Sequence, residues 1–232
     1  MENNSPESIR SDRSAVKRLS DRGHYDMETV HSILDAQVMC QIAFVHDGRP
    51  HIIPTLYGRS GNRVYFHGSV LSRMLIGAAS GPEICLSVSI IDAFVLARSA
   101  FHHSANYRSV VLYGRPFQVP DEEKNAALKV ISDHLLPGRW EECRAPSAGE
   151  LKATTVLCLE IEEGAAKARA QGAKDDPEDK LQDYWAGLLP VFNALGDPIP
   201  SSDLRDGIAL PESLTSIREM PFFSQEKNFK LT

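Results

Sequence analysis

The sequence has 232 residues, of which 42% are hydrophobic and 24% charged, so it is long enough to form a globular domain with a substantial core. Its formal net charge of −6 at pH 7 disfavours a nucleic-acid partner, because phosphate recognition needs a concentrated basic face. No segment approaches the roughly 20 apolar residues of a membrane helix, so we expect no membrane partner.

The cysteines indicate a reducing compartment. Cys40, Cys85, Cys143 and Cys158 form no CxxC pair, and none has a histidine at metal-ligand spacing. Cys40, Cys85 and Cys158 lie in apolar runs, where a thiol behaves as a small buried hydrophobe. Residues 1–22 contain no apolar stretch typical of a signal peptide. We therefore expect a cytoplasmic location.

The first third of the chain predicts a short helix followed by a meander. Residues 1–22 are rich in Ser, Arg, Asp and Asn and are predicted to form a flexible arm. Asp26 is a predicted N-cap for a helix over 27–37. Turn sequences at Asp47-Gly48 and Ser60-Gly61-Asn62 separate three predicted strands, which cover residues 38–46, 51–57 and 63–67.

Further strands dominate the middle of the chain. A short amphipathic helix is predicted from near Ser69 to Gly81-Pro82, and a longer one between Pro120 and Pro137. The other predicted strands cover residues 84–94, with a break at Asp92, then 96–101, 107–119 and 154–161. With so few helices, an antiparallel, Greek-key-like β-barrel with short flanking helices fits better than a doubly wound sheet.

The last third lacks strong periodicity. Residues 164–180 are rich in Ala, Lys, Asp and Gly and are predicted to be exposed. The remaining tail contains several prolines and an apolar group around Trp185, so it should lie over a surface without forming a core of its own. The predicted organisation is an arm over 1–22, a barrel over 23–163 and a loop-rich tail over 164–232, which packs on the barrel or on a dimer partner.

The stretch from His67 to Arg73 suggests an anion site. A strand ends near Gly68, and a helix begins close to Ser69, where unpaired amides and the positive end of the helix dipole favour an anion. Arg73 in the first turn would add a guanidinium. A Ser-capped helix with a surface arginine explains the same residues equally well. No GxGxxG or GxxxxGK[ST] motif supports a dinucleotide fold or a P-loop.

A polar stretch around His102-His103 separates two predicted strands. A plain polar loop is the favoured interpretation, and no acidic or cysteine residue lies nearby at ligand spacing. No metal site is predicted here.

Several ordered blocks make the sequence recognisable. They include residues 53–59, 65–69, 72–75, 96–104, 106–111, 137–140 and 184–187. Through these blocks, from about residue 16 to 190, the chain resembles the pyridoxamine 5′-phosphate oxidase superfamily, and in particular its flavin-nucleotide-binding branch that contains the nitroimidazole-resistance proteins. The resemblance implies a split β-barrel that binds flavin mononucleotide (FMN) and forms a homodimer with the cofactor at the interface.

The resemblance also implies roles for particular residues. Ser72 and Arg73 match the phosphate-binding pair, and His67, Gly68 and Ser69 match the strand end along the flavin. The other implied cofactor contacts are Pro54, Thr55, Asn106, Tyr107, Arg108, Ser109 and Trp185. His67 falls where nitroimidazole-resistance proteins carry a histidine tied to cofactor chemistry.

The expected activity is that of an FMN-dependent oxidoreductase which passes electrons from a nicotinamide to a small-molecule acceptor. His67 could donate a proton, although holding the cofactor by a hydrogen bond is the favoured role. Arg108 or Arg98 could stabilise an anionic reduced flavin. The alternatives are a carrier or sensor that binds flavin or haem without turnover, and a deazaflavin in place of FMN. The tail lacks the Arg-x-His ending that would hold pyridoxine phosphate, so pyridoxamine phosphate oxidation is not predicted.

Overall fold

A computed structural model describes residues 8–217. Ten antiparallel strands form one curled sheet in the order β1-β9-β6-β5-β2-β3-β4-β8-β7, and β10 pairs with β5 beside this path. The strands are β1 Gly23–His24, β2 Met39–His46, β3 Arg49–Ser60, β4 Arg63–Ser69, β5 Ile84–Leu96, β6 Ser104–Gly114, β7 Phe117–Gln118, β8 Thr154–Glu160, β9 Glu163–Arg169 and β10 Gly187–Pro190. The predicted antiparallel barrel class is confirmed.

Short helices cover the ends and one side of the sheet. They are α1 Met27–Leu34, α2 Arg73–Ser80, α3 Asp121–Leu135, α4 Ala148–Lys152 and α5 Glu212–Ser216, with 3-10 turns η1 Ser20–Arg22, η2 Ala100–His102 and η3 Asp179–Leu181. No helix in the part of the chain that the structure describes is long and apolar enough to cross a membrane.

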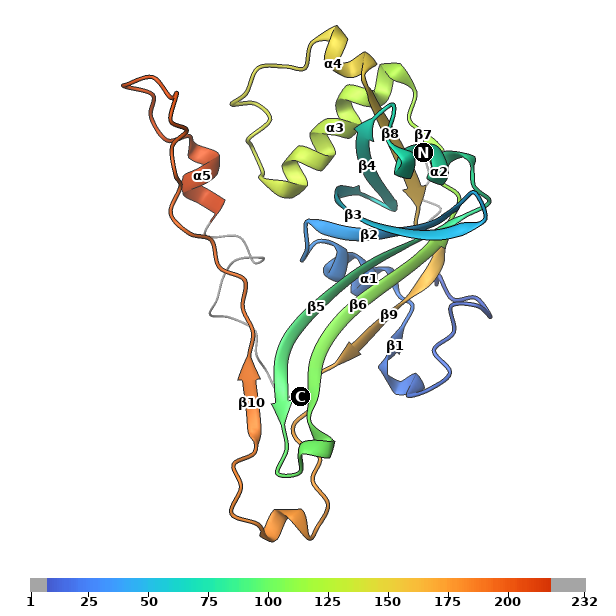
Figure 1. Ribbon diagram of the computed structural model, residues 1–232, viewed down its shortest axis with the longest axis vertical. Coiled ribbons are helices and arrows are strands. Elements are labelled where there is room, and N and C mark those ends of the chain that lie inside the picture. Colours follow the sequence, from blue (N-terminus) through green and yellow to red (C-terminus); the bar gives the residue numbers. More distant parts are fainter. Residues whose placement is uncertain (1–7, 218–232) are drawn as a thin grey trace.

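Figure 1 shows two regions. A compact body holds β2, β3, β4, β8 and the helices α1 to α4, and a curved stem made by the long strands β5 and β6 extends from it with β9 alongside. The main core lies inside the body, where the fully buried side chains include Tyr57, Phe66, Leu86, Leu112 and Leu157. A second cluster, around Ile131 of α3 and Val156 of β8, packs that helix against the sheet.

Strand β3 takes part in both halves of the barrel. Residues 49–56 pair with β2, whereas Tyr57 to Ser60 pair with β4. The two strands separate beyond the pair Tyr57↔Phe66, which leaves a fork between residues 54–56 of β3 and residues 67–69 of β4. The barrel is therefore split at this point.

Local sequence rules account for several elements. The side chain of Asp26 accepts a hydrogen bond from the amide of Thr29 (2.8 Å), which confirms the predicted N-cap of α1. Asp47 and Gly48 have φ angles of 50° and 70°, as a two-residue hairpin turn requires. The predicted break at Asp92 is a β-bulge within an otherwise continuous β5.

Some predicted boundaries were wrong. Helix α2 begins at Arg73 and not near Ser69, because Ser69 still pairs with Thr154 in the sheet. The predicted strand over 96–101 is absent, since β5 ends at Leu96 and η2 follows. The segment after 163 was predicted to be exposed, yet residues 163–169 form β9 between β1 and β6.

The expectation of a flexible arm does not describe residues 8–22. Ile9 is 1% exposed and belongs to the main core. Its amide donates to the carbonyl of Tyr25 (3.2 Å), and its carbonyl accepts from the amide of Gly164 (2.9 Å). Arg13 forms ion pairs with both Glu83 and Glu163. This segment therefore ties β5 and β9 together. Residues 1–7 of the predicted arm lie outside the described residues.

The cysteines behave largely as expected. Cys40 and Cys158 are buried, Cys85 is half-buried, Cys143 is exposed, and all four are free thiols. Burial raises the pKa of the Cys158 thiol to about 11 and that of Cys40 to about 12. Both thiols are therefore protonated at neutral pH.

Candidate functional site

The start of α2 faces the end of β4 next to the fork. Ser72 is the N-cap residue, with φ −66° and ψ 121°, but its side chain makes no capping hydrogen bond. The first N–H groups of a helix have no partner within the helix, and this cap supplies none. The first turn contains no acidic residue. The helix start therefore presents free amides and the positive end of its dipole.

Arg73 adds charge at this helix start. Its side chain is exposed, and it forms no ion pair with any residue that the structure describes. A cation in the first turn is unfavourable beside the helix dipole unless an anion lies between them. Gly68 approaches Leu75 and Ser72 so closely that a Cβ there would lie 3.2 Å from Leu75 Cδ1. A side chain at position 68 would therefore press against Leu75 and Ser72 at the start of α2.

His67 lies on β4 opposite Val156 of β8. Its Nδ1 atom is buried and has no hydrogen-bond partner among the described residues. Burial lowers the pKa of His67 below its ordinary value, so the ring is neutral at neutral pH. A neutral imidazole with an unsatisfied nitrogen can exchange a hydrogen bond with a ligand, and it is a poorer proton donor than imidazolium.

Buried histidines predict acid sensitivity of the fold. Burial lowers the pKa values of His31, His67 and His134. The unfolded chain binds protons at these residues as the pH falls below about 6.5, while the folded chain resists protonation. Stability should therefore be complete above that pH and decrease as the pH falls through the folded pKa values. Urea unfolding measured across this range should show the loss.

A matched pair of variants isolates this effect. His134→Gln should make the pH dependence of the unfolding free energy shallower, because His134 is half-buried against Tyr57 and lies 2.7 Å from the carbonyl oxygen of Gln37. His103 is exposed, in the connection between β5 and β6, so His103→Gln should leave the pH dependence of the unfolding free energy as it is in the wild type. An unchanged slope in His134→Gln would contradict this account.

Pro54 and Thr55 lie on the other side of the fork. They pair with Gln41 and Cys40 of β2, and no strand pairs with them on the side towards β4. Proline cannot donate a ladder hydrogen bond, and it is tolerated here because that second side of β3 has no strand. The structure thus brings Pro54 and Thr55 to the same fork as His67, Gly68 and Ser69.

Of the four predicted residues on β6, Asn106, Arg108 and Ser109 already have side-chain partners within the chain, and Tyr107 pairs through its backbone with Arg169 of β9. Asn106 is 1% exposed and its Oδ1 accepts from Arg169 Nη1 (2.5 Å). Arg108 forms a forked ion pair with Asp92 (2.7 Å). Ser109 Oγ lies 3.4 Å from the carbonyl oxygen of Lys167, to which it donates.

The charge of Arg98, the other arginine proposed to act on a flavin, is also compensated. Its Nη1 donates to Asp175 Oδ2 (2.8 Å), and its backbone amide donates to Asp175 Oδ1 (2.6 Å). The Asp175 side chain is only 2% exposed. Neither Arg98 nor Arg108 is therefore a free positive charge within one chain.

Trp185 lies far from the fork within one chain. It is 68% exposed and precedes β10, which pairs with the outer end of β5. Figure 1 shows that end of the stem and α2 at opposite ends of the molecule. The predicted contacts therefore form two groups: one at the fork and α2, the other along the stem.

The structure brings together one group that sequence spacing missed. His102, Asp176 and Asp179 offer ligand atoms that all lie within 4.8 Å of one another. The acidic residues come from a segment more than 70 positions away, so no local spacing could have indicated them. The group lies at the end of the stem with Asp176 exposed, and exposed acidic groups of this kind are common without a metal.

The sequence also gives no indication that Arg22 and Arg169 act on each other through their charges. Arg169 is 6% exposed at the end of β9, in a segment that the sequence predicts to be exposed. Alternation in a short Ala-rich run was the sole hint of a strand there.

The comparisons with known proteins agree with this architecture. A family profile described as pyridoxamine 5′-phosphate oxidase matches residues 26–168. The flavocytochrome Anf3 from Azotobacter vinelandii is 37% identical, with a TM-score of 0.85 over 91% of this chain and 98% of that chain. An FAD and haem binding protein from Mycobacterium smegmatis is 33% identical, with a TM-score of 0.81 over 84% and 96% of the two chains.

A more distant structure shares the fold alone. It comes from Bacteroides thetaiotaomicron, is described as a 5-nitroimidazole antibiotic resistance protein, and is 18% identical with a TM-score of 0.52. The match covers 61% of this chain and 83% of that chain. The two more similar structures, by contrast, cover 91% and 84% of this chain.

Proposed function

This chain belongs to the pyridoxamine 5′-phosphate oxidase family, and from that premise we propose that it binds a flavin nucleotide at the fork between β3 and β4 and acts as an oxidoreductase. The observation that carries the proposal is the uncapped start of α2 beside the exposed, unpaired Arg73. Such a helix start favours a phosphate, and Arg73 can add a charge-assisted hydrogen bond.

The residues at the fork fit a flavin nucleotide. Ser72, Arg73 and the first amides of α2 would hold the phosphate next to the ribityl chain. His67 would offer its unsatisfied Nδ1 to the cofactor, and Gly68 would permit close approach of the backbone. Pro54 and Thr55 would lie along the opposite side of the ring system. A bound flavin supplies the redox chemistry, with a nicotinamide as electron donor and a small molecule as acceptor.

FMN is the flavin that we propose. FMN and FAD share the phosphate at the ribityl chain, so the start of α2 would recognise either. The two more similar structures are described as a flavocytochrome and as an FAD and haem binding protein. Their similarity favours a second candidate function, in which the same barrel binds a flavin together with haem. A deazaflavin at the same place would need the same phosphate contacts.

We propose that the protein acts as a homodimer with the site at the interface. All residues from Phe192 to Leu210 are exposed, including the apolar side chains of Phe192, Ile199 and Leu210. This strap is held at one end by β10 and at the other by α5, where the amide of Ser213 donates to Glu142 Oε1 (3.0 Å).

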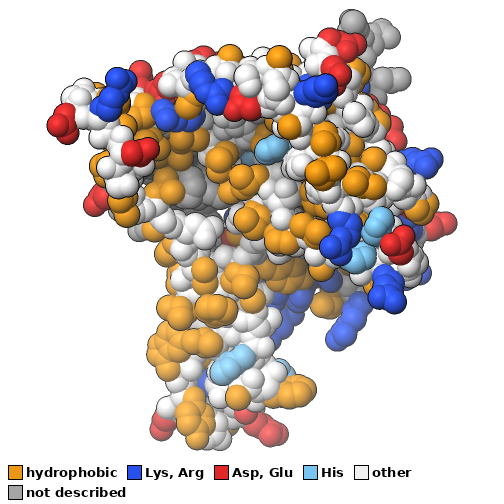
Figure 2. Space-filling view, turned by 45° about the horizontal axis from the view of Figure 1, so that its top comes forward, with side chains coloured by type: hydrophobic (Ala, Val, Ile, Leu, Met, Phe, Trp, Pro, Cys, Tyr) orange, Lys and Arg blue, Asp and Glu red, His pale blue; other side chains and the backbone are white. Residues whose placement is uncertain are grey.

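Figure 2 shows hydrophobic side chains gathered over the stem. Those exposed there include Ile91, Phe94, Trp185 and Leu189. Apolar surface of this extent favours a partner, and a second copy would bring the stem contacts of one chain to the fork of the other.

Sedimentation tests the dimer. The wild-type protein should sediment at twice its chain mass of 25.6 kDa. Phe192→Asp should shift the protein towards the monomer and release flavin. An exposed phenyl ring adds little to the stability of a single chain, so its replacement should matter only if a partner subunit covers it. Phe192→Tyr keeps the ring and should leave the dimer intact. A fully flavin-loaded monomer would refute the interface site.

The absorption spectrum of the untreated, purified protein tests the function. A flavin band in the visible region is expected, and mass spectrometry of the released cofactor should identify FMN, FAD or a deazaflavin. A Soret band in addition would favour the flavin-and-haem candidate. Oxidation of NADH or NADPH by the loaded protein would separate an enzyme from a carrier. A colourless protein that takes up no added flavin would refute the proposal.

A further inference from the structure

Arg169 is a buried cation without an acidic partner in the described part of the chain. Its Nη1 donates to Asn106 Oδ1 (2.5 Å) and lies 3.4–3.5 Å from the carbonyl oxygens of Gln171 and Ala105. Nη2 lies 3.4 Å from the carbonyl oxygen of Gly172. These acceptors are all neutral. A buried charge that is paired with neutral groups alone carries a large desolvation cost.

One edge of the Arg169 guanidinium has little contact with the described residues. The hydrogen bonds made by residues 8–217 use Nη1 three times, Nη2 once at a long distance, and Nε not at all. The Nε and Nη2 groups together form the side of a guanidinium that can bind both oxygens of a carboxylate or phosphate. Among residues 8–217, only the long contact to Gly172 competes with an anion on that side.

Arg22 places a second cation nearby. It ends η1 immediately before β1, and β1 pairs with β9 through Gly23↔Lys167. Arg22 Nε is buried and has no partner among the residues described. Burial, and then the charge of Arg22, lower the pKa of Arg169. Two like charges that act on each other, with no acid from residues 8–217 paired to either, are unfavourable unless an anion joins them.

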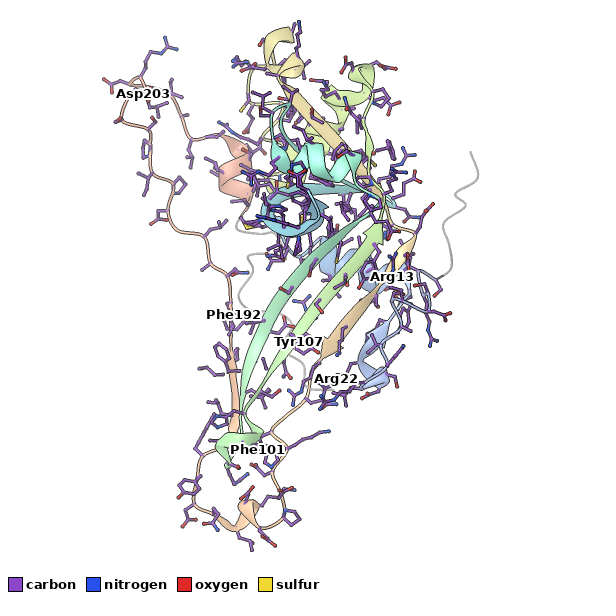
Figure 3. The ribbon with its side chains drawn as sticks, turned by 45° about the vertical axis from the view of Figure 1, so that its right-hand side comes forward. Arg13, Arg22, Phe101, Tyr107, Phe192 and Asp203 are labelled. Carbon is purple, nitrogen blue, oxygen red and sulfur yellow. The ribbon has the colours of Figure 1, made fainter. Side chains whose placement is uncertain are left out.

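Tyr107 lies on the other side of Arg169. The two residues are direct partners in the β6–β9 pairing, and the guanidinium of Arg169 donates to Asn106, the residue before Tyr107. Figure 3 shows Arg22 and Tyr107 near the end of β9, on the two elements that flank it. Figure 2 shows Lys and Arg side chains gathered beside the stem. Asn106, just before Tyr107, also has a buried Nδ2 without a partner in the described chain.

We propose that Arg169 and Arg22, next to Tyr107, form a second oxyanion site, which binds a phosphate or carboxylate group of a ligand. It is distinct from the start of α2, because it is built from β9, η1 and β6 on the stem. An oxyanion would accept from this edge of Arg169 and the buried Nε of Arg22, and would offset the repulsion between them. This second site does not require flavin binding at Arg73.

The test uses the full chain carrying Arg73→Gln, which removes the other proposed anion site. Isothermal titration with inorganic pyrophosphate should show one binding event per chain. Adding Arg22→Gln, or Arg169→Lys, should weaken it about tenfold to a hundredfold, since each removes a charge-assisted hydrogen bond. Arg18→Gln, an exposed arginine on the same segment, is the control and should have no effect.

A second titration separates the two kinds of ligand. Haemin and its dimethyl ester differ in their free carboxylates. Tighter binding of haemin than of the ester, lost in Arg22→Gln, would assign the site to a carboxylate ligand, whereas pyrophosphate binding alone would assign it to a phosphate. If the Arg73→Gln protein binds no pyrophosphate and does not distinguish haemin from its ester, the second site does not exist. Both titrations can be interpreted even if the protein binds no flavin, because neither of them uses flavin as the ligand.

Discussion

Replacing Arg73 with glutamine should weaken FMN binding about tenfold to a hundredfold, the equivalent of roughly 1.5–3 kcal/mol for a charge-assisted contact. The helix start would keep its free amides, so some affinity should persist. Riboflavin lacks the phosphate, and its weaker binding should not change. Quenching of flavin fluorescence on titration of the cofactor-free protein measures both affinities.

The comparison between the two flavins guards against a general loss of structure. A misfolded variant would lose riboflavin and FMN alike, whereas loss of a phosphate contact affects FMN alone. Arg49→Gln is the matched control, because Arg49 is also an exposed arginine on the body but lies at the far end of β3. If Arg73→Gln binds FMN as tightly as wild type, the phosphate does not lie at the start of α2.

Replacing Gly58 with alanine should destabilise the fold by about 3 kcal/mol, in the range of overpacked cores. A Cβ on Gly58 would lie 2.6 Å from Ile131 Cα and 2.6 Å from the carbonyl oxygen of Val130. Both atoms belong to the backbone of α3, so no side-chain rotation can relieve the clash. The melting temperature should fall by roughly 6–12 °C for a chain of this size.

Gly196→Ala is the control for this effect, since a Cβ there meets nothing within 4 Å and the residue has no positive φ. It should melt within a degree or two of wild type. Because α3 also covers the side of the sheet that carries His67, Gly58→Ala should loosen flavin binding as well. A variant as stable as wild type would mean that α3 does not lie this close to β3.

Where local rules dominate, the sequence predicted the structure well. The cap at Asp26, the turn at Asp47-Gly48 and the stop of α3 before Pro137 all follow from side-chain or backbone preferences of a few neighbouring residues. The body of the barrel was predictable for this reason. The start of α2 was misplaced because the sequence has two serines, Ser69 and Ser72, ahead of this helix, and only the pairing of Ser69 with Thr154 shows that the strand continues to the first of them.

Strand β9 could not be predicted from local preference. Glycine and alanine disfavour strands, but Gly164 lies against β6 so closely that a Cβ would be 2.4 Å from the carbonyl oxygen of Val111. Small residues are required there by tertiary contact, which overrides propensity. Ile9 was misjudged for a related reason, since one apolar residue in a polar segment gives no periodicity, although it fills the core.

The candidate site was partly readable. The helix-start chemistry around Arg73 follows from sequence, whereas the partners of Arg98, Asn106 and Arg108 do not. Asp175 and Arg169 lie more than 60 positions from the residues they contact, and only the pairing of β6 with β9 brings Arg169 to Asn106. Tertiary contacts therefore decide which arginine has its charge compensated, and the sequence does not show those contacts.

The order of strands has a consequence for biosynthesis. The first strand, β1, pairs with β9, and β4 pairs with β8. These early strands can therefore pair only after residues about 90 to 145 positions later in the chain have been synthesised. While the ribosome is still producing those later residues, the edges of β4 and β6 have no neighbour and can pair with other nascent chains. We expect the barrel to close only after Arg169 has left the exit tunnel, so these open strand edges are exposed to mispairing throughout translation.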